Sequence, residues 1–331
     1  MLLLIPLALV LTQQRTPLPV PAQDNPRLAE IEKTGNDLIK EGKYAELMKG
    51  APAQRAEILK MIEADQLGTA TDFIRASKLY DDPTGWYEVR RSEHEYALMA
   101  LALGSKDAPT NLRRTWDFLM ASLGQHPRFG FMKSSPQFPL PERLLSIYPP
   151  AALRRIFDEP EAAIADAKDA AESAEIKKLR DDDQAIRSGP IDVKKLHEEA
   201  ANDAARRRKV VELLEKGVPK TGADFDALGL VMQHGDNFDD FRLACELATA
   251  SVILGHKDPW LIPATYDRML LSVGQRQRFG TQFSENGLRP LDPVGINDRI
   301  RLQFRLPKLA DLKAREQEIL KRSFGGLPLQ P

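Results

Sequence analysis

The chain has 331 residues and nearly balanced charge, with 47 Lys and Arg against 48 Asp and Glu. Because charged residues make up 29% of the sequence, a protein with several membrane spans is excluded. The net charge of -1 gives no overall attraction to nucleic acid or acidic lipid, and the single cysteine, Cys245, allows neither an internal disulfide nor a cysteine-based metal cage.

The first residues predict an export signal. Residues 1–12 form an apolar run that is too short to span a bilayer but has the length of a signal-peptide core. We expect a signal peptide over 1–22, a short tether over 23–26, and a secreted or periplasmic location with no membrane contact beyond the signal segment. An uncleaved anchor or a misassigned start is the alternative.

The rest of the chain carries helix start and stop signals, and no long stretch alternates apolar and polar residues. Pro26 begins a helix that Gly42 ends. Pro190 lies in the first turn of a long helix that stops at Gly217, with Val211 on its predicted buried face.

Two further helices follow, and both have clear boundaries. Thr221 and Asp224 form a capping-box start for a helix that runs to about His234. The run 239–254 is strongly apolar and stops at Gly255, so we expect it to be buried between other helices. These patterns predict an all-α fold.

An internal repeat is the most informative feature of the sequence. Residues 104–107 (GSKD) match 255–258 (GHKD) at an offset of 151, and residues 124–130 (GQHPRFG) match 274–280 (GQRQRFG) at an offset of 150. This repeat is far longer than a tetratricopeptide or HEAT unit. We therefore predict two similar helical domains, with an N-terminal copy over 27–160, a charged helical connector over 161–189 and a C-terminal copy over 190–325.

Residues shared by both copies are interpreted as structural. Asp117 and Arg128 in the first copy match Asp267 and Arg278 in the second. Since paired charges are more often architectural than catalytic, we expect each pair to hold a helix to the loop that follows it. The shared glycines are expected to end helices or to allow tight turns.

Polar residues present only in the C-terminal copy are the candidates for function. The differing positions, C-terminal copy first, are Gln233-His234-Gly235 against Asp81-Asp82-Pro83, Arg268 against Phe118, Gln277 against Pro127, and Gly280-Thr281-Gln282-Phe283 against Gly130-Phe131-Met132-Lys133. Drift of exposed loops after the duplication is the alternative explanation.

Several of these residues belong to a wider set of motifs. The set comprises Asp183-Gln184, Arg187, Asp203, Gln233-His234-Gly235, Asp267-Arg268 and the run 274–282. Together they resemble a bacterial family, domain of unknown function 6624, over about residues 175–310. Gln275 and Phe279 depart from the family, which favours Lys and Tyr there, and the N-terminal copy is similar to a degenerate relative. The resemblance implies a site but no activity.

If the copy-specific residues converge, they combine an imidazole, a carboxylate, guanidinium groups, a hydroxyl and carboxamides. His234 would act as a general base oriented by Asp267, and the arginines would bind a carboxylate or phosphate. The candidate catalytic residues are His234 and Asp267, and the candidate ligand-binding residues are Arg268, Gln275, Gln277, Arg278, Thr281 and Gln282. We expect no metal and no cofactor, because the five histidines lack zinc-ligand spacing.

Three functions stay open. The absence of a nucleophile elbow, a P-loop and a zincin motif favours a binding or interaction module for a polar or anionic ligand, either a small molecule or a protein. The alternatives are a hydrolase that uses His234 and Asp267, and a structural scaffold. The basic run 206–209 is interpreted as a solvated, salt-bridged helix face, so no nucleic-acid partner is expected.

Overall fold

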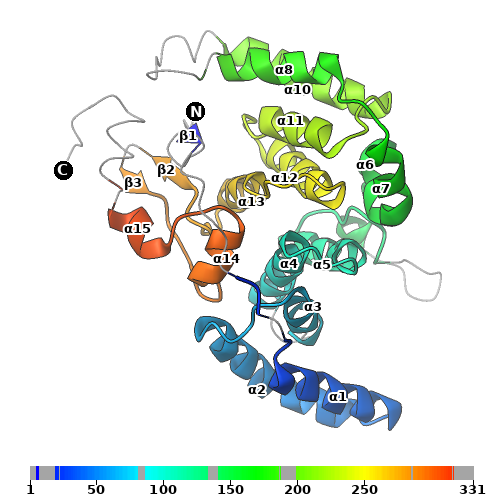
Figure 1. Ribbon diagram of the computed structural model, residues 1–331, viewed down its shortest axis with the longest axis vertical. Coiled ribbons are helices and arrows are strands. Elements are labelled where there is room, and N and C mark those ends of the chain that lie inside the picture. Colours follow the sequence, from blue (N-terminus) through cyan, green and yellow to red (C-terminus); the bar gives the residue numbers. More distant parts are fainter. Residues whose placement is uncertain are drawn as a thin grey trace. The chain divides into compact units, whose positions relative to one another are not determined.

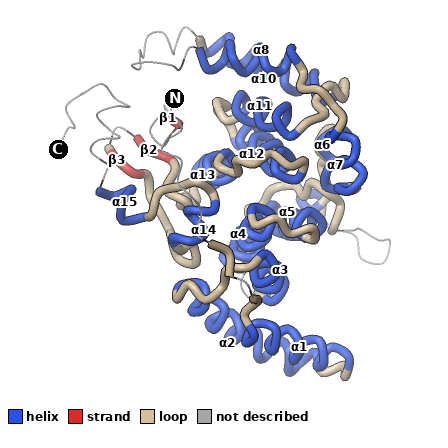
Figure 2. Tube along the Cα trace, viewed as in Figure 1, coloured by secondary structure: helices blue, strands red, loops and turns tan. Residues whose placement is uncertain are grey.

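The computed structural model describes residues 5–6, 19–21, 23–80, 86–132, 141–185, 187, 199–284, 286–314 and 316. These residues form 14 α-helices and three short strands, which confirms the predicted all-α class (Figure 1, Figure 2). The chain divides into an N-terminal unit of residues 18–149 and 295–303, and a C-terminal unit of residues 1–17, 150–294 and 304–331. Most of the predicted signal peptide lies outside the described residues.

The N-terminal unit is built around a helix that is buried on nearly every side. Its elements are α1 (Pro26–Lys40), α2 (Tyr44–Glu63), α3 (Ala70–Leu79), α4 (Tyr87–Ala102), α5 (Ala108–Ser122), a 3-10 helix (Glu142–Leu144) and α14 (Asp298–Gln303). Helix α4 packs against α3, α5 and α14. The side chain of Gln303 on α14 donates to the carbonyl of Ala102 at 2.8 Å, and this bond ties residues 295–303 to the unit.

The C-terminal unit also has a buried central helix. Its helices are α6 (Ala151–Asp158), α7 (Pro160–Lys168), α8 (Ala174–Ala185), α10 (Ala200–Glu215), α11 (Gly222–Met232), α12 (Phe238–Ile253), α13 (Leu261–Ser272) and α15 (Leu309–Ala314). Helix α12 packs between α11 and α13, and α8 and α10 cover α11 (Figure 1). The predicted connector therefore contains α8, a helix that belongs to this unit's packing.

A small sheet completes the C-terminal unit. Strands β1 (Ile5–Pro6), β2 (Gln282–Ser284) and β3 (Gly287–Leu288) pair antiparallel in that order. The register places Phe283 opposite both Ile5 and Leu288. The sequence did not predict these strands, because two or three residues are too few to establish an alternating pattern.

Most predicted helix boundaries are confirmed. Helix α1 begins at Pro26 and is followed by Gly42 with a φ of 70°, and α11 begins with the predicted capping box. The prediction for Val211 was wrong, since it is 36% exposed while Val210 and Leu214 of the same helix are buried. The predicted helix start at 190 lies outside the described residues.

The N-terminal unit contains a loop anchored by a single buried carboxylate. Asp117 on α5 accepts the backbone N–H groups of Arg128, Phe129 and Phe131 at 2.6, 2.8 and 2.7 Å. Burial outweighs these bonds and raises the pKa of Asp117 above its ordinary value. Gly130 allows the tight loop through its φ of 70°.

The C-terminal unit repeats this anchor. Asp267 on α13 accepts the N–H groups of Arg278, Phe279 and Thr281 at 2.7, 3.0 and 3.0 Å, and Gly280 has a φ of 69°. The shared aspartates and glycines are therefore structural, as predicted.

Candidate functional site

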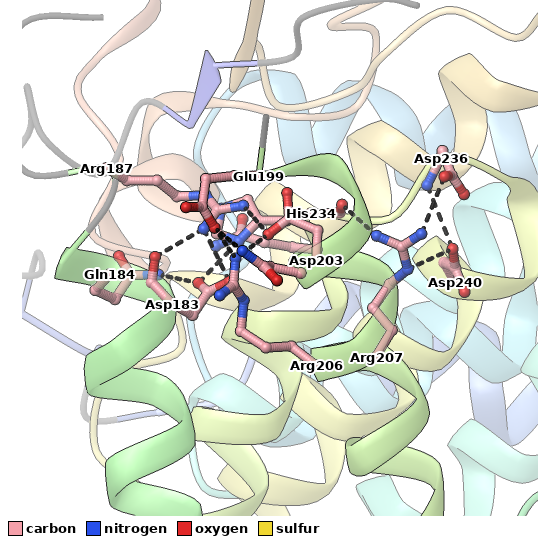
Figure 3. A network of polar contacts seen from close by, with 12 residues as sticks. Asp183, Gln184, Arg187, Glu199, Asp203, Arg206, Arg207, His234, Asp236 and Asp240 are labelled. Atoms are coloured by element: carbon pink, nitrogen blue, oxygen red, sulfur yellow. Dashed lines mark hydrogen bonds and ion pairs between the residues drawn. The ribbon is translucent and has the colours of Figure 1, made fainter. Parts of the chain in front are cut away.

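A buried network of charged residues joins three helices of the C-terminal unit (Figure 3). Asp183, near the end of α8, is at its centre, and its side chain is 1% exposed. It accepts from Arg187 at 2.9 Å and lies 3.5 Å from the Nε of Arg206 on α10. Its other oxygen lies 3.0 Å from the Nδ1 of His234, which follows α11. Figure 3 shows these side chains pointing toward one another.

Two further carboxylates belong to the network, and one of them, Glu199, lies 3.6 Å from Arg206. Asp203 on α10 accepts from Arg187 at 2.8 Å and from Arg206 at 2.6 Å. Burial favours the neutral carboxyl, but the two arginines outweigh it and hold the pKa of Asp203 below its ordinary value. Both arginines are thus shared between Asp183 and Asp203, and α8 is fixed to α10.

Two further arginines hold the turn that carries His234. Arg207 on α10 donates to the carbonyl of His234 at 3.1 Å and pairs with Asp240 at 3.2 Å. In Figure 3, Arg207 points away from Asp183, toward the start of α12. Arg268 on α13 donates to the carbonyl of Gln233 at 2.5 Å. The backbone of the turn is therefore positioned from both sides.

The turn itself requires glycine. A Cβ at Gly235 would lie 2.2 Å from the Cβ of Asp240, a distance that real side chains do not tolerate. Gly235 therefore lets α12 begin close enough for Asp240 to reach Arg207.

The imidazole of His234 is held neutral inside this network. Burial lowers its pKa, as do the nearby charges of Arg187 and Arg268, while Asp183 acts in the opposite direction. Its side chain is 6% exposed. Among the residues that the structure describes, no group forms a hydrogen bond with Nε2.

Two glutamines of the C-terminal unit also carry buried atoms without partners. Neither Oε1 nor Nε2 of Gln233 has a hydrogen-bond partner within the described part of the chain, and Gln233 is 1% exposed. The same is true of Oε1 of Gln282, whose Nε2 donates to Ala264 at 3.0 Å. Burial, together with the charge of Arg187, lowers the pKa of Arg268 to about 9. We call the residues around His234 the His234 cluster: Asp183, Arg187, Glu199, Asp203, Arg206, Gln233, His234 and Arg268.

Asp267 does not orient His234. Its oxygens accept from the loop over 278–281, including the hydroxyl of Thr281 at 2.8 Å, so they serve the loop anchor. The carboxylate beside His234 is Asp183. The predicted role of Asp267 is corrected on this physical ground.

Other predicted ligand-binding residues are used by the fold. Gln277 donates to the carbonyls of Gln282 and Arg289 and accepts from the N–H of Gln282, so all its amide atoms are bonded. Arg278 donates to the carbonyls of Asp292 and Val294. These two residues hold the loop after α13.

The two remaining predicted ligand-binding residues also have structural bonds. The hydroxyl of Thr281 donates to Asp267, and the N–H of Gln275 donates to the carbonyl of Leu270 at the end of α13. Of the predicted site residues, the structure therefore brings His234 and Arg268 together, while Gln282 bonds to Ala264 on α13 and to Thr281.

Asp183, Arg187 and Asp203 belong to the sequence motifs but were not predicted as site residues. Their spacing in sequence gave no sign that α8 and α10 converge on His234. The basic run 206–209 was interpreted as solvated, yet the side chains of Arg206 and Arg207 are only 12% and 13% exposed. The preceding acidic residue Asp203 was the available signal, since it pairs with Arg206.

The corresponding position in the N-terminal unit is aromatic. Phe118, the counterpart of Arg268, packs edge-on against Phe131, the counterpart of Thr281, with ring centroids 5.4 Å apart. The guanidinium of Arg90 lies 4.7 Å from the Phe118 centroid. Residues 81–83, the counterparts of 233–235, lie outside the described residues.

A surface groove of about 420 Å³ runs along α10 and the start of α12. Arg207, Met232 and Asp240 line part of it, and no residue of the His234 cluster does. In the described ranges, no group of three or more His, Cys, Asp or Glu residues is arranged to hold a metal ion. No helix among the described residues is long and apolar enough to cross a membrane.

Comparisons with known proteins do not assign the chain to a family. No family model, no curated protein and no solved structure matches the chain. The resemblance to domain-of-unknown-function family 6624 therefore stays a prediction.

Proposed function

We propose that the C-terminal unit binds a small polar molecule with an anionic group at the His234 cluster. The observation that carries this proposal is the set of buried atoms without partners on the adjacent residues Gln233 and His234. A buried polar group left without a hydrogen bond costs about 1–3 kcal/mol, and native proteins pair such groups with protein, water or ligand. A ligand that pairs all of them would gain affinity and specificity.

Three guanidinium groups are the candidate contacts for an anionic group of the ligand. They belong to Arg187, Arg206 and Arg268, and the first two are also paired with Asp183 and Asp203. Burial strengthens electrostatic interactions, so these groups would act more strongly on an anionic group than they would on the surface.

Thermal unfolding of the full chain tests this proposal. The probes are propionate, lactate, gluconate and inorganic phosphate, with glucose as the uncharged control. A ligand at ten times its Kd adds about 1.4 kcal/mol of stability. That corresponds to a rise in Tm of about 3–6 °C for a unit of this size.

A pair of variants makes the test specific to the cluster. Gln233→Leu should abolish the rise in Tm. Arg299→Gln, which removes an ion pair with Asp65 in the N-terminal unit, should preserve it. If no anion raises the Tm, or if Gln233→Leu responds like the unmodified chain, the proposal is refuted.

A hydrolase is the second candidate function. The contact between His234 and Asp183 favours it, because a neutral imidazole oriented by a carboxylate can act as a general base. Asp183 would take the orienting role that the sequence analysis gave to Asp267. A hydrolase screen in which His234→Ala abolishes turnover would support this candidate.

If the chain is a scaffold only, replacing His234, Arg268 or Gln282 would change stability and nothing else.

Three wider proposals accompany the binding site. The two units arose by internal duplication, which the matching anchors at Asp117 and Asp267 support. The C-terminal copy is related to domain-of-unknown-function family 6624. The chain is exported, either secreted or periplasmic, as the apolar start of the sequence suggests.

A further inference from the structure

One stripe of helix α10 faces the surface groove described above. Ala204, Arg208, Val211 and Glu215 all line this groove. They follow one another at intervals of four, three and four residues, so they lie on one side of the helix. Arg208 and Glu215 are exposed, Val211 is 36% exposed and Ala204 is partly buried. This alternation of three and four residues is typical of a helix side that packs against another helix.

Two of the five charged residues that line the groove are unpaired. Arg207 and Asp240 pair with each other at 3.2 Å, and Glu212 pairs with two lysines of its own helix, one of them at 3.3 Å. Arg208 and Glu215, in contrast, form no ion pair or hydrogen bond with any residue that the structure describes. The stripe therefore offers one cation and one anion to a partner.

The positions of these two charges make the stripe complementary to itself. Arg208 and Glu215 are seven residues apart, which is two helical turns and about 10.5 Å along α10. When a twofold axis relates two antiparallel helices, the numbers of facing residues have a constant sum. An axis between positions 211 and 212 therefore places Arg208 of each copy opposite Glu215 of the other, which gives two identical ion pairs.

The same axis joins the apolar part of the two stripes. Val211 lies beside the axis, so the Val211 side chains of the two copies contact each other, next to the groove wall that Met232 forms. Glu212 also lies beside the axis, but its charge is compensated by lysines of its own helix. A parallel pairing in register would instead bring Arg208 against Arg208 and Glu215 against Glu215, so the charges select the antiparallel arrangement.

We infer that the groove along α10 binds the same groove of a second copy of the chain, with the two α10 helices packed antiparallel about a twofold axis. A partner of one predominant charge fits this stripe less well, because it is attracted at one end and repelled at the other. The inference does not depend on ligand binding, since no residue of the His234 cluster lines the groove.

The expected dimer is weak and reversible. Helix α10 has 16 residues and is therefore about 24 Å long. A contact centred on one pair of such helices falls at the small end of the range of protein interfaces, where complexes are transient. We expect a Kd on the order of micromolar.

Analytical ultracentrifugation of the full chain at increasing concentration tests the inference. The unmodified chain should change from monomer to dimer. Arg208→Glu and Glu215→Arg should each raise the Kd at least about tenfold, because each variant replaces two attractive pairs with two repulsive ones. The control Lys178→Glu reverses an exposed charge on α8, outside the groove, and should leave the Kd unchanged.

An equimolar mixture of the two charge-reversal variants tests the arrangement itself. Every facing pair in the mixed dimer again joins opposite charges, so the mixture should dimerise at concentrations where each variant alone is monomeric. Recovery in the mixture would also show that both variants fold.

Three results would overturn the inference. The first is a chain that stays monomeric at every concentration. The second is a dimer that both charge reversals leave intact, because its interface would then lie elsewhere. The third is loss of the dimer in each variant without recovery in the mixture, because antiparallel pairing requires that recovery.

Discussion

Two buried glutamines of the C-terminal unit should respond in opposite ways to the same substitution. Gln233 is 1% exposed, and its amide atoms have no partners within the described residues. Gln277 is 0% exposed, and its amide makes three hydrogen bonds. Leucine fills a similar volume without polar atoms, so each substitution removes the amide and leaves the packing largely intact.

The expected magnitudes follow from the hydrogen bonds. Gln233→Leu removes a buried amide without partners, so it should leave the free energy of unfolding unchanged or raise it by about 1–3 kcal/mol. Gln277→Leu removes three bonds and leaves the carbonyl of Arg289 and the N–H of Gln282 unsatisfied, while the carbonyl of Gln282 still accepts from the N–H of Arg289, so it should lower that free energy by about 2–3 kcal/mol.

Urea unfolding followed by circular dichroism measures both values on the full chain, with the midpoints compared at equal slope. A loss of more than about 1 kcal/mol for Gln233→Leu would refute the reasoning, because it would mean that the amide is satisfied in the folded protein. A gain or no change would mark Gln233 as a residue kept for a purpose other than stability.

Three further predictions concern the rest of the network and the N-terminal unit. Asp183→Asn should lower the free energy of unfolding in urea by about 3 kcal/mol, because it leaves buried arginines without one of their carboxylate partners. The control Asp181→Asn, at an exposed site of the same helix, should have no measurable effect. Burial lowers the pKa of His94 to about 3, so the unfolded chain takes up a proton at His94 at a higher pH than the folded chain does. The free energy of unfolding should therefore fall by about 1.4 kcal/mol per pH unit as the pH drops below about 6.5. His94→Gln should remove this loss from unfolding curves measured over the same pH range. Gly235→Ala should both lower the Tm and weaken ligand binding, because the alanine Cβ would displace Asp240 and the turn that carries His234. An unchanged Tm would contradict this account of the turn.

The helices could be predicted because their signals are local. The capping box of Thr221 and Asp224 lies within one turn and needs no tertiary partner, and the same holds for the proline start of α1. Val211 shows the limit of this approach, because which side of an amphipathic helix is buried depends on where its neighbours pack.

Comparison of the two predicted copies pointed to part of the candidate site for a physical reason. The aligned positions hold Phe118 in one unit and the buried cation Arg268 in the other, and such a difference is visible in a pairwise alignment. The convergence of Asp183 and Asp203 on His234 is set by the packing of α8 and α10 against α11, which no local pattern encodes. For the same reason Asp267 was assigned to His234 although its oxygens are occupied by a loop 11–14 residues further along the chain.

A high-resolution crystal structure tests the central claim most directly. The full chain would be crystallised with lactate or gluconate, whichever raises the Tm more. The account predicts that oxygens of the bound acid lie within hydrogen-bond distance of His234 Nε2 and the amide of Gln233. Finding these two side chains bonded to other protein groups, or to water alone, would contradict it.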